Sequence, residues 1–188
     1  VPAAMHLCRL GYTYLDNITE YDSKTNILTD VFLRSVQRLN PALSELQARQ
    51  LLNEITLILD NNDLGREFYN KLSSNSNIKL IDFQDADSNE WHVTTEFTCE
   101  NQDNGDSFRP DITCFVNGLP LAFIEVKKPN NHDGILAERE RINVRMRNEK
   151  FRRFLNVTQL MIFSNNQEYD NENRVPIQGA FYCCSSRD

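Results

Sequence analysis

Two apolar runs joined by Asn-Gly constrain the fold of this chain more than any other feature. They read ITCFVNGLPLAFIEV, from Ile112 to Val126. Asn-Gly between β-rich runs predicts a hairpin, because both residues accept the positive φ angles that a tight turn requires. The second run is apolar on both faces over much of its length, as in a buried strand. The sequence therefore predicts a buried hairpin here.

Three charged residues stand at the open end of this hairpin: Asp111, Glu125 and Lys127. A clean two-residue turn would pair Asp111 with Ile124 and turn Glu125 to the other face. A three-residue connection or a bulge would place Asp111 opposite or diagonal to Glu125, on the face that also carries Lys127. Charges that appear abruptly at the end of a buried strand more often mark a cleft. We therefore predict a three-residue connection or a bulge near residues 115–120.

Two carboxylates and an ammonium group on one face are costly to desolvate unless they pair or bind a cation. Oxygen ligands from Asp111 and Glu125 suit Mg²⁺ or Mn²⁺, and Lys127 could then hold an attacking water or offset developing charge. The alternative interpretation is that Asp111 caps its strand while Glu125 and Lys127 form a surface pair. The apolar flanks of the strand weigh against that alternative.

The rest of the chain predicts an α/β (α+β) fold with a mixed central β-sheet flanked by helices. The opening residues look like the end of a helix that runs into Gly11 and a short strand, and Ser44 and Gln47 form a capping box. Periodicity predicts helices over 29–40, 44–61, 64–73 and 133–155, strands over 75–83, 91–99, 158–166 and 179–185, and loops over 100–110 and 167–176.

Composition narrows the class of protein. The 188 residues suffice for one domain, and the net charge of −7 argues against a protein that grips nucleic acid by bulk charge alone. Five cysteines without metal-finger spacing are typical of reduced thiols packed as small hydrophobes. No apolar run approaches the roughly 18 residues of a membrane span. We expect a cytoplasmic protein without a membrane partner.

The hairpin residues resemble a known motif. Pro110-Asp111 followed by Glu125-Val126-Lys127 is similar to the PD-(D/E)XK nuclease motif. The fuller string DITCFVNGLPLAFIEVKK resembles the N-terminal endonuclease domain of the restriction (R, motor) subunit of type I restriction–modification enzymes. The later stretch LMIFSNN resembles the next core strand of that domain.

The resemblance implies a restriction-endonuclease-like core and a single endonuclease domain over 1–188, the N-terminal fragment of a larger R subunit. It implies Mg²⁺-dependent cleavage of double-stranded DNA, with ATP used only by motor domains that this chain lacks, and with separate specificity and modification subunits. Asp111 and Glu125 would be metal ligands, the Val126 carbonyl an extra ligand, and Lys127 the catalytic lysine. The alternatives are a non-catalytic docking module of the same fold and a stand-alone nuclease of the same superfamily.

Two departures from the family pattern accompany this resemblance. The helix after the hairpin has no Q-x-x-x-Y motif, and no Glu precedes Gly11. Arg139, Arg141 and Arg145 stand near the position where the first motif would lie. The local excess of arginine predicts contact with DNA phosphates or a partner, against the alternative of a solvated helix with surface ion pairs.

A few other polar residues are weighed individually. Glu96 is a candidate third acidic group near the metal, although a surface position is the more ordinary expectation. The three histidines have no partner in the sequence, so we expect surface or core positions for His6, His92 and His132. Trp91 is expected to pack in the core or against another domain.

Overall fold

The computed structural model describes residues 2–74, 78–100, 107–128, 134–164 and 180–183. Its strands form a six-stranded sheet in the order β1-β2-β5-β6-β7-β8 and a separate two-stranded sheet of β3 and β4. The neighbours β1–β2 and β6–β7 are parallel and the other pairs antiparallel, so the sheet is mixed. The bounds are Thr13–Tyr14 (β1), Trp91–Thr95 (β2), Cys99–Glu100 (β3), Ser107–Phe108 (β4), Ile112–Val116 (β5), Leu119–Val126 (β6), Leu160–Ser164 (β7) and Ala180–Cys183 (β8).

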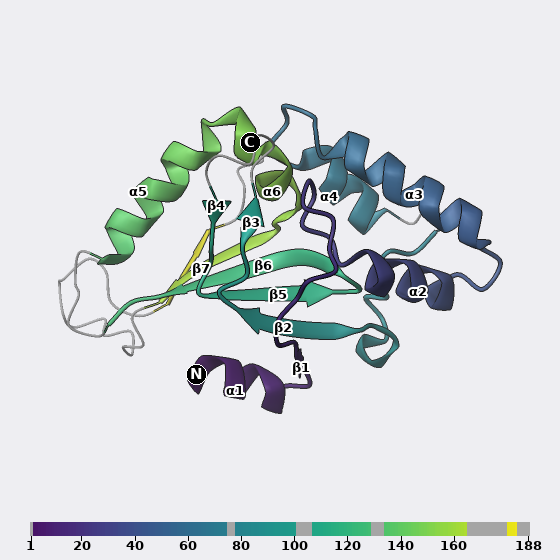
Figure 1. Cartoon of the computed structure of the whole chain (residues 1–188), viewed down its shortest axis with the longest axis horizontal. Helices are drawn as coiled ribbons and strands as arrows, with labels where there is room; N and C mark the ends of the chain where they lie inside the picture. The colour runs from purple at the N-terminus through teal and green to yellow at the C-terminus, as the bar shows by residue number, and fades with distance from the viewer. Residues whose placement is uncertain (1, 75–77, 101–106, 129–133, 165–179, 184–188) are drawn as a thin grey trace.

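Helices lie on both sides of the sheet, as the α/β prediction requires (Figure 1). Their bounds are Pro2–Arg9 (α1), Thr29–Leu39 (α2), Glu45–Ile58 (α3), Arg66–Ser73 (α4), Gly134–Met146 (α5) and Arg152–Val157 (α6), with 3₁₀ turns at Ala86–Ser88 (η1) and Glu149–Phe151 (η2). The predicted capping box is present at the start of α3, where Ser44 accepts from the Gln47 N–H and Gln47 accepts from the Ser44 N–H.

Alternate residues of the hairpin strands enter different apolar clusters. Ile112 and Cys114 pack with Ala3 and Leu7 of α1. Phe115 and Phe123 pack on the other face with residues of α5 and α6. At the turn end, Val116, Leu119 and Leu121 join the cluster built by α2, α3 and α4. The hairpin is therefore buried on both faces, which explains its nearly continuous apolar sequence.

The predicted bulge is present in this hairpin. Val116 pairs with Leu119 across a two-residue Asn117-Gly118 turn, but the register shifts between Cys114 and Phe115. Phe115 pairs with Pro120 and Cys114 with Ala122, which leaves Leu121 as the extra residue. Both turn residues have positive φ, 50° at Asn117 and 81° at Gly118. The turn is therefore tight, and the bulge alone sets the register beyond it.

Two predicted strands differ from the structure. Residues 78–83 form no strand; Leu80 and Ile81 are buried, while the side chain of Asn40 bonds to the backbone of Lys79 and that of Asn117 to the carbonyl of Leu80. Asparagine side chains thus satisfy backbone groups that a strand would pair with a neighbour. The remainder of the predicted strand 75–83 lies outside the described residues.

The predicted strand 91–99 ends at Thr95. Glu96 has φ +53°, which turns the chain, so Val93 faces α1 whereas Phe97 enters the opposite cluster. Cys99 then pairs with Phe108, so the predicted loop 100–110 contains part of a small sheet. Residues 101–106 are not described, nor is the predicted loop 167–176.

The long helix predicted over 133–155 is wrong. Helix α5 ends at Met146, and Asn148 caps the short turn η2 by accepting the N–H of Lys150 before α6 begins. The break lets Phe151 and Phe154 both enter the core. No helix in the described residues is both long and apolar enough to cross a membrane.

Candidate active site

Asp111 lies at the end of β5, where it contacts the strand that carries Glu125. Because Ile112 pairs with Ile124, extending the register by one residue places Asp111 opposite Glu125. The Asp111 carboxylate accepts the N–H of Val126 at 2.7 Å, and its main-chain carbonyl accepts the N–H of Glu96 at 3.1 Å. These bonds fix Asp111 beside the end of β6, as the bulged register predicted.

Glu125 is a buried carboxyl in a crowded electrostatic environment. Only 5% of the residue is exposed. Burial is the largest influence on its pKa, followed by the charges of Asp111 and Glu138, and together they raise the pKa from 4.5 to about 7 despite the opposing charge of Lys127. A carboxyl with this pKa changes protonation near neutral pH and gains from a cation placed next to it.

Lys127 reaches the same site from the end of β6. Its Nζ is 3.8 Å from a carboxylate oxygen of Glu125 and 2.9 Å from Oε2 of Glu138 on α5. The structure thus brings together the three residues predicted from the hairpin, Asp111, Glu125 and Lys127. Their roles as metal ligands and catalytic lysine, and that of the Val126 carbonyl, remain predictions.

Glu138 is a site residue that the sequence interpretation missed. It is 4% exposed and also accepts from Arg141 at 3.0 Å. Its position four residues before the buried Ile142 places both on one face of α5, a spacing that could have indicated an inward-facing charge. Among the described residues, no group of three or more His, Cys, Asp or Glu side chains is arranged to hold a metal ion.

An open cleft of about 700 Å³ lies beside Asp111 and Val126. His6 and Glu96 also line it, although both are exposed and Glu96 lies 4.0 Å from Arg109. Glu96 therefore lies near the predicted site, but its role in metal binding stays a prediction. Of the surface and core positions expected for the histidines, His92 occupies a core position. His132 lies outside the described residues.

The three arginines predicted to contact DNA have different environments. Arg139 is exposed, and the side chain of Arg141 is 65% exposed although it pairs with Glu138. The guanidinium carbon of Arg145 lies 4.2 Å from the centre of the Phe108 ring. One guanidinium nitrogen is buried and has no hydrogen-bond partner among the described residues. Arg145 is thus partly committed to packing.

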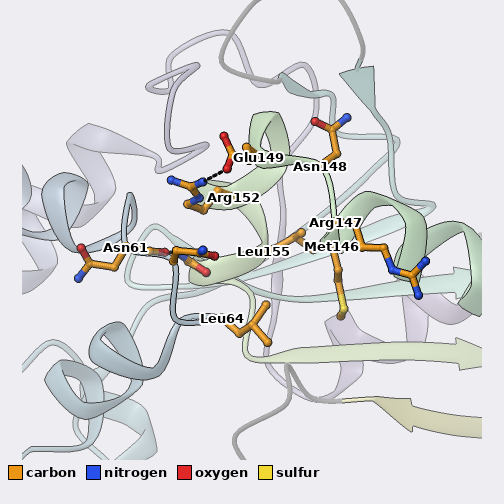
Figure 2. A pocket seen from close by; sticks show the side chains of 10 residues that line it. Asn61, Leu64, Met146, Arg147, Asn148, Glu149, Arg152 and Leu155 are labelled. Atoms are coloured by element: carbon orange, nitrogen blue, oxygen red, sulfur yellow. Dashed lines mark hydrogen bonds and ion pairs between the residues drawn. The ribbon is translucent and has the colours of Figure 1, made fainter.

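A second, smaller pocket of about 200 Å³ lies where α5 ends and η2 begins (Figure 2). Arg152 and Glu149 form an ion pair of 3.0 Å in its lining. Exposed Arg147 and Asn61 also line it. The pocket does not include any of the three hairpin charges, so it is separate from the candidate active site.

Comparisons with known proteins agree with the family that the hairpin sequence resembles. A family model described as the type I restriction enzyme R protein N terminus matches residues 1–170. The putative type I restriction enzyme MjaIXP endonuclease subunit of Methanocaldococcus jannaschii is 32% identical over 154 residues, which cover 69% of this chain and 15% of that protein. The putative MjaVIIP endonuclease subunit of the same organism is 38% identical over 87 residues, covering 46% of this chain and 8% of its own length. The chain therefore spans less than a sixth of these curated relatives.

Proposed function

The chain belongs to the family of type I restriction enzyme R protein N termini, and we propose that it is a Mg²⁺-dependent endonuclease domain that cleaves double-stranded DNA. The observation that carries the proposal is the bulged hairpin, which brings Asp111 opposite Glu125 with Lys127 beside them. Carboxylates at strand ends, next to an open cleft, are where a DNA phosphate and a cation could meet.

The residues present fit a hard divalent cation. The carboxyl of Glu125 is buried next to the charge of Asp111, and a cation between them would relieve that repulsion. Asp111 and Glu125 would hold Mg²⁺, with the Val126 carbonyl as a further ligand. When present, Mg²⁺ would lower the pKa of a water molecule that it coordinates and would stabilise negative charge on the phosphate.

Lys127 would act on the water and the phosphate. Its ammonium group donates hydrogen bonds, so it orients the attacking water and offsets the negative charge that develops as the P–O bond of the leaving strand breaks. The α5 arginines Arg139 and Arg141 would contact phosphates of the DNA backbone, with Arg145 as the third candidate.

The wider assembly is part of the same proposal. We infer a role within an ATP-dependent type I restriction complex in the cytoplasm, with ATP consumed by motor domains outside this chain and with specificity and modification subunits as partners. The relatives, named as putative type I restriction enzyme endonuclease subunits, support the type I system.

The proposal is tested in the complete R subunit assembled with its partner subunits. Asp111→Ala and Lys127→Ala should abolish DNA cleavage in the presence of ATP and Mg²⁺ while leaving ATP-driven translocation intact. Exposed Lys128→Ala, next to the site in sequence, is the control and should still cut. Cleavage that survives both site variants in a folded protein would overturn the catalytic role of these residues and favour a docking module. Cleavage without ATP or partner subunits would indicate a stand-alone nuclease.

A further inference from the structure

We propose that Glu138 is the positioning residue for Lys127, so that helix α5 sets the place of the lysine in the site. This inference rests on the proposed function, in which Lys127 is catalytic. Glu138 acts through the lysine, because its ionic contacts are with Lys127 and Arg141.

The two carboxylates near Lys127 hold it unequally. At 2.9 Å, the contact of Nζ with Glu138 is within the range of a charge-assisted hydrogen bond. At 3.8 Å, the contact with Glu125 is longer than a hydrogen bond. Glu138 is therefore the carboxylate that fixes Nζ, and it leaves Glu125 available for another partner.

The burial of Glu138 argues against a general stabilising role. Its side chain is 6% exposed, whereas that of Lys127 is 23% exposed. A buried ion pair commonly contributes no more stability than a well-packed apolar pair, and Ile142 shows that this face of α5 accepts an apolar residue. Burying a charged carboxylate here costs desolvation energy, so its presence is better explained by the contact that it makes with the Lys127 ammonium group.

Arg141 helps to offset the cost of burying the charge of Glu138. Its Nη1 lies 3.0 Å from the same Oε2 atom that Lys127 contacts. Two cations on one oxygen compensate for the loss of water around a carboxylate that lies near the carboxyl of Glu125. Arg141 is also on the exposed side of α5, so the link joins a surface helix to the end of β6.

The test uses the complete R subunit assembled with its partners, and the variants Glu138→Gln, Glu138→Asp, Glu140→Gln and Lys127→Ala. Glu140 is the matched control because it lies on α5, is exposed and accepts a hydrogen bond from Asn143 rather than contacting Lys127. Two quantities are measured: the rate at which an amine-acylating reagent labels Lys127, by mass spectrometry, and the rate of DNA cleavage.

In Glu138→Gln the reagent should label Lys127 about fivefold faster than in the wild type. This is the change expected when an interaction of about 1 kcal/mol that holds the lysine is lost at 25 °C. Glu138→Gln should also slow cleavage about 10- to 100-fold, because a small displacement of a catalytic group is costly. Glu138→Asp keeps the charge and should fall between wild type and Glu138→Gln in both measurements. Glu140→Gln should change neither.

Lys71 is the internal reference for folding. Its side chain is 21% exposed and pairs with Glu54 at 2.7 Å, so it resembles Lys127 in exposure and pairing. Its labelling should be unchanged in every variant, and faster labelling of both lysines in Glu138→Gln and Glu138→Asp would contradict a specific effect on Lys127.

The outcomes separate the two proposals. Unchanged labelling of Lys127 in Glu138→Gln overturns the positioning role, and so does faster labelling with normal cleavage. Normal cleavage by Lys127→Ala instead overturns the proposed function of the lysine, whatever the labelling shows. Loss of cleavage in Lys127→Ala together with the graded effect of the Glu138 variants supports both.

Discussion

The carboxylate of Asp111 stands beside the carboxyl group of Glu125, and the proximity of the two contributes to the raised pKa of Glu125, about 7. Burial is the larger cause, so the fold itself keeps Glu125 in an environment that disfavours its charge. Burial of the charged form of Glu125 lowers the stability of the fold, but it leaves a carboxyl that can bind a cation at neutral pH.

Glu125→Gln should stabilise the metal-free protein above pH 7. Because the pKa of Glu125 is raised from 4.5 to about 7, the folded state binds a proton that the unfolded state lacks between these values. The contribution of Glu125 to the free energy of unfolding therefore falls as pH rises from about 4.5 to 7, by at most about 3 kcal/mol. Above pH 7 this contribution stays constant. Chemical denaturation at a series of pH values measures it. A gain that is the same at every pH would contradict the assignment, and exposed Glu96→Gln is the control.

Mg²⁺ should stabilise the wild-type protein more at pH 8 than at pH 6. A protonated Glu125 cannot ligate the ion, so apparent affinity should fall about tenfold for each pH unit below about 7. Thermal unfolding with increasing Mg²⁺ concentration measures the effect. Asp111→Asn should greatly reduce it at both pH values, and an undiminished response in this variant would remove Asp111 from the metal site.

Gly118→Ala should destabilise the fold. A Cβ at this position would lie 2.6 Å from the Leu28 carbonyl oxygen and 2.7 Å from the Phe32 nitrogen, and φ is +81°. The backbone contact cannot be relieved by a rotamer change, so we expect a loss of about 2 kcal/mol or more in the free energy of unfolding. Gly11→Ala is the control for positive φ without a clash, since no described residue beyond its chain neighbours has an atom within 4 Å of the added Cβ. Equal losses in the two variants would show that φ alone matters.

Arg139→Gln should weaken DNA binding without destabilising the protein. Arg139 is exposed, so its expected contribution is a phosphate contact, whose loss lowers the slope of log K against log salt by about 0.9. Arg145→Gln should instead lower thermal stability, because the Arg145 guanidinium packs over Phe108. Binding of a DNA duplex measured at several salt concentrations, with thermal unfolding alongside, distinguishes the two. An unchanged salt slope in Arg139→Gln would place Arg139 outside the interface.

Local patterns failed where backbone partners were not local. Residues 78–83 have the apolar pattern of a strand, but Asn40 and Asn117 supply hydrogen bonds from distant positions, so no strand forms. The predicted helix over 133–155 breaks because Asn148 caps a new turn and directs Phe151 into the core. The partners of residues 78–83 lie far away in the sequence, and so do most residues of the cluster that receives Phe151, whereas the Asn148 cap is local and could have been recognised.

The sequence by itself determined the hairpin, the capping box of α3 and the three charges at the end of the hairpin. These features depend on neighbouring residues: Asn-Gly favours a tight turn, and the strand period of two assigns each side chain to a face. Only the tertiary structure decided that Leu121 is the bulged residue and that Glu138 contacts Lys127 from another element. It also decided that the chain turns at Glu96, so that the residues after it pack on the opposite face of the sheet. The physical reason is that burial and ion pairing depend on which surfaces pack together, and residues far apart in the chain create those surfaces.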